Sequence, residues 1–453
     1  MANYVAYPVY APDGFPSSWE QKRLRFALKM NPSKGEIDLE HSDLVSFVPM
    51  DAVGEYGGIR LSEEKELGEI GSGYTYFRDD DVVVAKITPC FENGKGALAK
   101  GLSNKTAFGT TELHVMRADR EQLEPEFLFY LTTSDLFRKF GESEMYGAGG
   151  QKRVPESFIK DFRVGFPSIG EQQTIARFLD FKTAQIDALI AKKKSLLDKL
   201  AEKRTALISH AVTKGLDSSV PMKDSGVAWL GDIPAHWEAK RTKFTVSYIG
   251  SGKTPKGGSE VYVQEGIMIL RSQNVHDKGL RLDDVAYITD EADSAQAASR
   301  VLAGDVLLNI TGASIGRTSI VPTPFPQANV NQHVCILRPV RDLVTPEYLY
   351  LLLCSRQAKD QISSLENGTC REGLNFTQVG GLLFAFPPIQ EQVAIVLTLA
   401  AKVKAIDRQS GKVLSVIERL VEYRSAVITN AVTGKIDVRD FQIPQPAEVQ
   451  ETA

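Results

Sequence analysis

EKRTALISHAVTKGLD (residues 202–217) and EYRSAVITNAVTGKID (residues 422–437) are the two stretches that decide how this chain folds. Eight of their 16 positions are identical, and most of the others are conservative replacements. The same shift of 220 residues relates FPSIGEQQTIARFLD, which begins at residue 166, to FPPIQEQVAIVLTLA, which begins at residue 386. A repeat at a fixed interval is the mark of a duplicated structural unit. The sequence therefore predicts two long helices that begin and end alike.

The repeat extends upstream of both helices. The further matching pairs are FPSSWEQKRLRF (15–26) with IPAHWEAKRTKF (233–244), DVVVAKIT (from 81) with DVLLNIT (from 305), and LEPEFLFYLTTS (123–134) with VTPEYLYLLLCS (344–355). Trp19 and Trp237 anchor the first of these pairs. Short apolar runs bounded by Gly, Asp, Asn and Pro are typical of an α+β domain with recognition loops. The chain thus consists of two copies of one order, a variable domain followed by a long helix.

Residues of the two predicted helices recur at alternating spacings of four and three, which is the heptad pattern of a coiled coil. The predicted seam of the first helix is Ile175, Leu179, Lys182, Ile186, Leu189, Lys193, Leu196, Leu200, Lys203, Leu207 and His210. The predicted seam of the second helix is Ile395, Leu399, Lys402, Ile406, Gln409, Val413, Val416, Leu420, Tyr423, Val427 and Asn430. Each helix is about 44 residues and roughly 65 Å long at 1.5 Å per residue. Two matched seams predict that the helices pack against each other.

The ends of the helices also carry signals. Ser168 with Glu171 forms a capping-box pattern at the first start, and Gly215 and Gly434 mark the two ends. Because the first helix leads away from the first domain and the second must return, we expect an antiparallel pair. The predicted fold is α+β, with two tandemly duplicated α/β domains separated by two long antiparallel coiled-coil helices and related by a pseudo-two-fold axis. A partner with nearly two-fold symmetry, such as duplex DNA, suits this arrangement.

Composition sets limits on the function. The chain has 453 residues, a net charge of -4, 43% hydrophobic and 24% charged residues, as is usual for a globular protein. Its charge gives no global basic field, so any nucleic acid must be held by local patches. The cysteines and histidines form no pattern typical of a metal site. No signal segment and no apolar run long enough to span a membrane are evident, so we expect a cytoplasmic protein without membrane contact.

One stretch resembles a nucleotide-binding loop. GSGKTPKGG (250–258) contains a Gly-Lys-Thr triplet, but Ser247 stands where a P-loop requires its first glycine. A phosphate-backbone contact through Lys253 and Lys256, or a solvated surface loop, fits this stretch better than an ATP site. The chain also lacks the motif of an adenine methyltransferase and the paired carboxylates of a nuclease. We therefore expect no catalytic residue and no covalent chemistry in this chain.

Equivalent loops precede the two long helices: MYGAGGQKRVPESF (145–158) and ENGTCREGLNF (366–376). Both combine flexible glycines with donors that can reach base edges and phosphates, although a solvated turn is an equally good interpretation of each residue. His114 and His333 lie in apolar strands and are interpreted as core residues, not ligands. The predicted DNA-contacting side chains are Lys95, Gln151, Lys152, Arg153, Lys253, Lys256, Arg271, Gln273, Asn274, Arg317, Thr369, Arg371 and Asn375.

The F-P-x-I-x-E-Q helix starts, the E-x-R-x-A-[LV]-I-x-x-A-V-T helix ends and MKDSGVAWLGDIPAHWE (222–238) together resemble the DNA-specificity subunit of type I restriction-modification enzymes. The resemblance covers essentially the whole chain. It implies double-stranded DNA with a bipartite site, two methyltransferase subunits and two restriction/translocase subunits as partners. It also implies no cofactor in this chain, with S-adenosylmethionine in the methyltransferase and ATP and Mg in the nuclease.

On this resemblance the two variable domains are target-recognition domains, and the long helices set the spacer between the half-sites and dock the methyltransferases. The predicted segments are recognition domain 1 (1–165), the central helix (166–216), a linker with recognition domain 2 (217–385), the C-terminal helix (386–437) and a disordered tail (438–453). The alternative is a non-enzymatic coiled-coil scaffold that binds protein partners only. Binding of DNA, weakened by salt, would distinguish the two.

Overall fold

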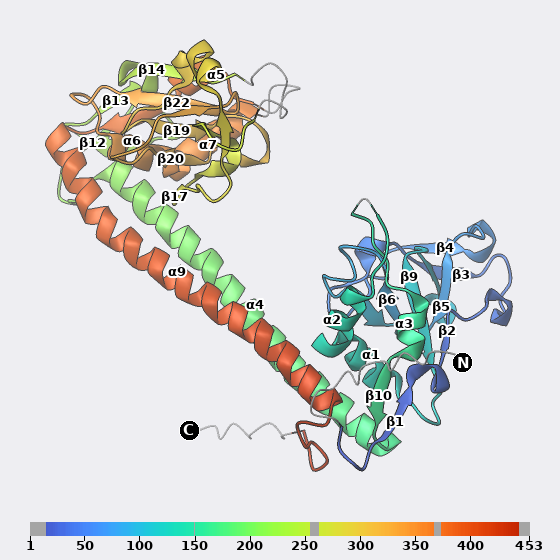
Figure 1. The fold of residues 1–453 in the computed structure, drawn as a ribbon. Helices are drawn as coiled ribbons and strands as arrows, with labels where there is room; N and C mark the ends of the chain where they lie inside the picture. The colour runs from blue at the N-terminus through green and yellow to red at the C-terminus, as the bar shows by residue number, and fades with distance from the viewer. Residues whose placement is uncertain (1–14, 149, 254–261, 367–372, 444–453) are drawn as a thin grey trace, which may run out of the picture. The chain divides into compact units, whose positions relative to one another are not determined.

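The computed structural model describes residues 15–148, 150–253, 262–366 and 373–443. The chain divides into two compact units: Met1–Lys193 with Ser415–Ala453, and Lys194–Leu414. Both divisions fall inside the long helices α4 (Ile169–Lys214) and α9 (Ile389–Val432), which are drawn in Figure 1. Each unit therefore contains a globular part, the first half of one long helix and the second half of the other.

The first unit has a central antiparallel sheet in the order β2-β9-β6-β7. Its strands are β2 (Leu28–Met30), β9 (Leu113–Ala118), β6 (Val82–Ala85) and β7 (Gly96–Leu98). β6 is buried throughout, because both faces of this sheet are covered. Val82 and Val84 pack with the helices, whereas Val83 and Ala85 pack toward a second sheet.

That second sheet has the order β4-β3-β8-β5. Its strands are β4 (Glu64–Glu66), β3 (Leu44–Val48), β8 (Thr106–Gly109) and β5 (Thr75–Arg78). β3 and β8 are parallel, and the other pairs are antiparallel. Three short helices belong to the same unit: α1 (Pro125–Thr133), α2 (Asp135–Ser143) and α3 (Glu156–Asp161). Strand β1 (Glu20–Arg23) pairs with β10 (Arg163–Phe166), directly before α4.

The second unit repeats this plan. Its central sheet has the order β14-β22-β19-β20, with β14 (Val246–Ser251), β22 (Val334–Pro339), β19 (Val306–Asn309) and β20 (Thr318–Ile320). A second sheet has the order β18-β15-β21, with β18 (Ala286–Ile288), β15 (Ile267–Leu270) and β21 (Ala328–Val330), and β15 and β21 are parallel. Leu307 of β19 faces this sheet, while Val306 and Leu308 face the helices. The layers therefore follow the same order in both units.

The remaining elements of the second unit also have counterparts in the first. The helices α6 (Pro346–Cys354), α7 (Arg356–Glu366) and α8 (Phe376–Gly381) correspond to α1, α2 and α3, and the pair β13 (Glu238–Arg241) and β23 (Leu383–Phe386) corresponds to β1 and β10. The unit also contains α5 (Asp290–Ala295) and the short strand pairs β11 (Met222–Asp224) with β12 (Asp232–Pro234) and β16 (Val275–His276) with β17 (Gly279–Leu280).

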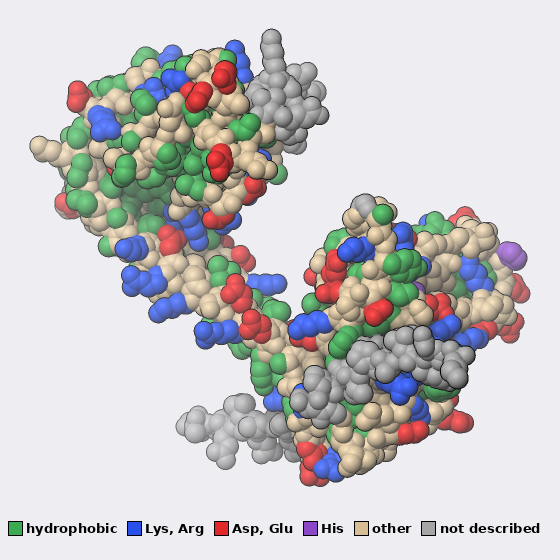
Figure 2. Space-filling model, viewed as in Figure 1, with side chains coloured by type: hydrophobic (Ala, Val, Ile, Leu, Met, Phe, Trp, Pro, Cys, Tyr) green, Lys and Arg blue, Asp and Glu red, His purple; other side chains and the backbone are tan. Residues whose placement is uncertain are grey.

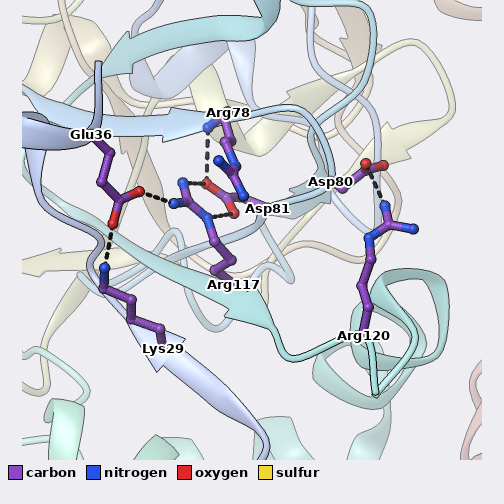
Figure 3. Close-up of polar contacts among 7 residues, drawn as sticks. All are labelled: Lys29, Glu36, Arg78, Asp80, Asp81, Arg117 and Arg120. Carbon is purple, nitrogen blue, oxygen red and sulfur yellow. Dashed lines mark hydrogen bonds and ion pairs between the residues drawn. The ribbon is translucent and has the colours of Figure 1, made fainter. Parts of the chain in front are cut away.

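Each central sheet contains a buried Asp-Arg ion pair at the same place. Asp81, which is 1% exposed, accepts from Arg117 Nε and Nη2 at 2.7 Å each (Figure 3). Asp305, also 1% exposed, accepts from Arg338 Nε and Nη2 at 2.9 Å each. Each aspartate also accepts a backbone N–H, so its charge is fully hydrogen-bonded as burial requires.

The start of each long helix is tied to the tryptophan of its own unit. Trp19 Nε1 donates to Glu171 Oε1 at 3.2 Å, and Trp237 Nε1 donates to Glu391 Oε1 at 3.1 Å. The predicted capping box is thus only half formed. The Glu171 N–H donates to Ser168 Oγ, as a capping box requires. The Glu171 carboxylate, however, accepts from Trp19 and not from the backbone N–H of Ser168.

The glutamine that follows each of these glutamates fastens the helix to the globular part. Gln172 is fully buried, donates to the Gln122 and Pro167 carbonyls and accepts the Glu124 N–H. Gln392 is equally buried, donates to the Leu343 and Pro387 carbonyls and accepts the Thr345 N–H. The repeated Glu-Gln pair is therefore explained by two specific contacts.

The ends of the helices dock through a repeated hydroxyl. Ser209 near the end of α4 accepts the Arg356 N–H at the start of α7, and Thr429 near the end of α9 accepts the Asp135 N–H at the start of α2. Both end glycines have the predicted left-handed conformation, with φ of 78° at Gly215 and 73° at Gly434. A Cβ on Gly434 would lie 2.4 Å from Pro16, so the close approach also requires glycine there.

The long helices pack antiparallel within each unit, but the predicted seam is wrong at alternate positions. Leu189, Leu196, Lys203 and His210 of α4, and Lys402, Gln409, Val416 and Tyr423 of α9, are exposed. Their C-terminal neighbours, such as Leu197 and Arg204 in α4 and Ile417 and Arg424 in α9, are the less exposed residues. The predicted seam first departs from the structure after Leu179, where the buried residue is Thr183 and not Lys182. Thr183 faces the globular part of its unit and lies next to Tyr130.

The segment after α9 is partly packed. Val438 is buried, and the Phe441 ring lies 5.1 Å from Phe178 and 5.8 Å from Phe181 of α4, measured between ring centroids. The predicted tail 438–453 therefore starts too early, and its residues 444–453 lie outside the described part of the chain. In the described residues no helix is long and apolar enough to span a membrane.

Candidate nucleic-acid interface

The loop before α3 contains three of the predicted DNA-contacting residues in the first unit. Arg153 forms isolated bridges with Ile87 and with Tyr146, and Thr88 Oγ1 donates to the Gly150 carbonyl at 2.7 Å. These contacts hold the loop against the end of β6. Gln151 and Lys152 are exposed on it, so their side chains are accessible to a ligand.

Arg153 has a partner of its own in the same unit. Its Nε and Nη2 donate to the two carboxylate oxygens of Glu112 at 3.0 and 2.9 Å. The hydrogen bonds and charge of Arg153 lower the pKa of the Glu112 carboxyl below its ordinary value. The guanidinium of Arg153 therefore orders the loop. Two of its N–H groups are bound to Glu112, so only the others could contact DNA.

The matching loop of the second unit is described only at its end. Gly373 bridges Thr311, as Arg153 bridges Ile87 in the first unit, and Thr311 Oγ1 lies 2.6 Å from His333 Nδ1. Asn375 is exposed and caps α8, accepting the Gln378 N–H at 2.9 Å. Thr369 and Arg371 lie outside the described residues, as does Lys256.

A turn after β15 brings Arg271, Gln273 and Asn274 together around Asp284. Arg271 Nη2 lies 3.3 Å from Asp284 Oδ1, and Gln273 Nε2 donates to Asp284 Oδ2 at 2.5 Å. Asn274 is 2% exposed, and its amide donates to the Arg281 and Asp284 carbonyls. Both of its amide hydrogens are thus used within the turn, which leaves it no donor for a base edge.

The other predicted contacts differ in what surrounds them. Arg317 and Lys253 are exposed, whereas Lys95 Nζ donates to the Met50 carbonyl at 2.9 Å and supports a neighbouring turn. The predicted set therefore contains side chains that are free to bind and side chains that hold the loops.

Two residues were missed by the sequence prediction. Tyr146, in the loop before α3, is 65% exposed, and an aromatic ring at this place can stack on a base or sugar. Tyr146 lies in the same glycine-rich loop as Lys152, so the sequence alone could have indicated it as a contact residue. Glu112, by contrast, lies 41 residues from Arg153, and nothing local in the sequence links them.

The histidines and cysteines indicate no metal centre in the described part of the chain. His114 is buried, its Nε2 lies 2.9 Å from the Val154 carbonyl oxygen, and burial lowers its pKa. Cys90, Cys335 and Cys354 are free thiols. Across the described residues, no three His, Cys, Asp or Glu side chains are grouped so that they could hold a metal ion.

A family model for the type I restriction modification DNA specificity domain matches residues 65–199 and 238–419. The chain therefore belongs to the family of type I restriction-modification DNA specificity subunits and contains two target-recognition domains. Members of this family are non-catalytic and carry no cofactor, which confirms both predictions.

Individual relatives agree with this membership. The type I restriction enzyme EcoEI specificity subunit of Escherichia coli is 40% identical over 165 residues, which are 36% of this chain but only 27% of the relative. The MjaVIII specificity subunit of Methanocaldococcus jannaschii is 21% identical over 430 residues, covering 94% of this chain and 95% of the relative.

A solved structure has the same fold. It belongs to work on complex assembly and conformational transition of the type I R-M system, and its TM-score is 0.64 at 20% sequence identity. The match covers 93% of this chain and 99% of that chain, so the predicted duplicated fold is confirmed over nearly the whole length.

Proposed function

We propose that each target-recognition domain reads one half of a bipartite target in double-stranded DNA. The observation that supports this most is the contrast within the duplication: the contacts that fasten helices to domains repeat, whereas the loops do not. Gln172 and Gln392 bind backbone groups at matched positions of their own units. The pair of Glu112 and Arg153, which orders the loop of the first unit, is not repeated. In the second unit His333 replaces Glu112, and Gly373 replaces Arg153. Two domains mounted alike but with different loops are suited to two different half-sites.

The proposed segments are 1–165 and 217–385 for the recognition domains with their linker, and 166–216 and 386–437 for the helical segments. Because α4 runs without interruption for 46 residues, it corresponds to ~69 Å of helix. We propose that the helices set the spacer between the half-sites and dock two methyltransferase subunits, with two restriction subunits joining the complex. S-adenosylmethionine would bind to the methyltransferases, and ATP and Mg to the restriction subunits.

The DNA contacts are proposed from exposure and charge. Gln151, Lys152, Lys253 and Arg317 are exposed, and Lys256, Thr369 and Arg371 are added from the sequence. Arg271, Gln273 and Arg153 share their donors with carboxylates and would contact DNA only with their remaining N–H groups. Lys95, Asn274 and Asn375 support turns and a helix start and are proposed to position the others.

Lengthening one helix tests the spacer proposal. Four residues inserted between Lys194 and Ser195 add about 6 Å to α4, which equals one to two base pairs at a rise of 3.4 Å per pair. The expected result is a spacer longer by one or two base pairs with both half-site sequences unchanged. A matched insertion between Leu414 and Ser415 should restore part of the lost stability, because it realigns the two helices.

The readout is a map of methylated adenines in cells that carry the variant with its partner subunits. An active variant with the original spacer would refute the proposal that the helices measure distance. Altered bases in either half-site would show that the helices also take part in base recognition.

A loop substitution tests the proposed interface. Lys152→Ala should weaken DNA binding on all sequences alike and lower the salt dependence by about one counterion, as for a phosphate contact. Lys100→Ala, which removes an exposed lysine paired with Glu126 at 2.7 Å, is the control and should leave affinity unchanged. Affinity of the Lys152 variant equal to that of the natural protein at every salt concentration would remove this loop from the interface.

A further inference from the structure

A pocket of about 250 Å³ lies in the second unit where its globular part meets its helices. The apolar walls are Ile320, Leu351, Val396, Leu399, Ala400 and Val403, from β20, α6 and α9. In Figure 2 hydrophobic side chains line a hollow at this junction, with basic and acidic side chains next to it. The polar end of the pocket consists of Arg204, Lys278, Glu347, Tyr350 and Asp407, and the Tyr350 hydroxyl donates to the Asp277 carbonyl at 2.6 Å.

In the first unit a buried tyrosine stands at the position that matches Leu351. Tyr130 is 5% exposed, its hydroxyl donates to Asp180 Oδ1 at 2.6 Å, and it lies 3.4 Å from Thr183 Oγ1. The repeat places Leu351, Ala400 and Val403 of the second unit at these three positions. The pocket is therefore present where a phenol ring and its two polar partners have been replaced together by smaller or apolar side chains.

The polar end of the pocket also differs between the units. Arg424 Nε and Nη2 in the first unit donate to the two carboxylate oxygens of Asp187 at 3.0 and 3.2 Å. The matching Arg204 Nε lies 3.5 Å from Asp407 Oδ1, and Lys278 Nζ lies 3.9 Å from the same oxygen. Neither Arg204 Nε nor Asp407 Oδ1 forms a hydrogen bond, although both atoms are buried. A buried guanidinium N–H and a carboxylate oxygen at the edge of an apolar pocket leave hydrogen-bonding capacity for a ligand.

We propose that this pocket binds a free monocyclic aromatic molecule that carries one hydroxyl group, of the size of a tyrosine side chain. The ring would be held by Leu351, Ala400 and Val403, and the hydroxyl would reach Arg204 or Asp407. Ligand pockets for small rings typically combine apolar walls with a few polar groups at one end, and this pocket has both. Binding at this junction couples the ligand to the docking of the second recognition domain on its helices. The proposal does not depend on the DNA target.

The probe is p-cresol, which is the tyrosine side chain as a free molecule. Titrated into the full-length chain without DNA, it should produce saturable changes in ligand-observed NMR and should raise the melting temperature of the second unit. Toluene, which lacks the hydroxyl, should bind about tenfold more weakly, because one hydrogen bond to a charged group is lost. Equal affinity for both molecules would overturn the assignment of Arg204 and Asp407 to the hydroxyl.

Exchange of the three residues between units gives a matched pair of variants. Leu351→Tyr with Ala400→Asp and Val403→Thr fills the pocket as the first unit does, and binding should be lost. Tyr130→Leu with Asp180→Ala and Thr183→Val should open an apolar site in the first unit that binds p-cresol and toluene alike, because Arg424 is already paired with both carboxylate oxygens of Asp187. If the filled variant does not fold, Ala400→Leu alone should block the ring. No saturable binding of p-cresol to the natural chain, or binding unaffected by Ala400→Leu, would overturn the proposal.

Discussion

The two units of this chain are the same where helices meet domains and different where the domains present their surfaces. The Trp-Glu contact, the buried glutamine and the hydroxyl that accepts a helix N–H occur in both units with nearly the same distances. The loops before α3 and α8, the second sheets and the junction pocket differ. The contacts that fasten the domains to the helices are therefore the same in both copies, whereas the surfaces of the domains are not.

The largest expected effect comes from the buried Asp-Arg ion pair that each of the two central sheets contains. Asp81→Ala and Asp305→Ala should each lower the free energy of unfolding of their own unit by about 3 kcal/mol, because a partly buried arginine loses the buried carboxylate that accepts two of its N–H groups. Arg117 keeps its pair with the less buried Glu36, which Figure 3 also shows. Thermal or denaturant unfolding followed by unit-specific fluorescence measures the loss. Arg120→Ala, which breaks the more exposed pair with Asp80 shown in Figure 3, should cost less than about 0.5 kcal/mol. Equal losses in Arg120→Ala and Asp81→Ala would contradict the role assigned to burial.

The buried glutamines should give the next largest effect. Gln172→Leu and Gln392→Leu each leave one N–H and two carbonyls without their amide partner, at a cost of about 2 kcal/mol. The two losses should be alike, since the contacts are alike. Gln173→Leu is the neighbouring control, and it should be nearly neutral because Gln173 is exposed and meets only Glu124. A large difference between the two buried sites would show that the helices are fastened differently.

A smaller effect tests the two long helices against each other. Gly411 of α9 corresponds to Ala191 of α4, and a Cβ on Gly411 would meet no atom within 4 Å. Gly411→Ala should therefore stabilise the protein by about 1 kcal/mol, and Ala191→Gly should destabilise it by about as much. Calorimetry of the two variants measures both changes. A loss of stability in Gly411→Ala would mean that the helix needs its glycine for a bend.

The smallest expected effect concerns pH and the loop of the first unit. The pKa of Glu112 is lowered by Arg153, so the contact contributes stability above the ordinary carboxyl value of 4.5 and loses it as pH falls through the lowered pKa. Amide exchange at Arg153 and Val154, measured relative to the intrinsic rate, should become faster in that acidic range, because the loop loses the contact that orders it. Glu112→Gln should show the weaker protection already at neutral pH. The second unit has His333 at this place and should lack the transition.

Some of the site was predictable because its signals are local. Loops before α3 and α8 were identified from glycines and donors that lie close together in the sequence, and Gln151 and Lys152 are exposed as such loops require. The partners of Arg153 and Asn274 were not predictable. Glu112 and Asp284 approach them only after the strands have paired, so the choice between a DNA contact and an internal support is made by tertiary packing.

The duplication, the order of domains and long helices, the approximate lengths of those helices and their glycine ends could be predicted from the sequence. Periodicity, turn residues and repeats are properties of neighbouring residues, and they need no third dimension. Which residues of the helices face inward, and what the repeated Glu171 and Glu391 bind, became clear from the folded structure. The same is true of the buried Tyr130 in the first unit and of the pocket at the matching place in the second. These outcomes depend on segments that are far apart in the chain, because a side chain can bind a distant partner only after packing has brought the two together.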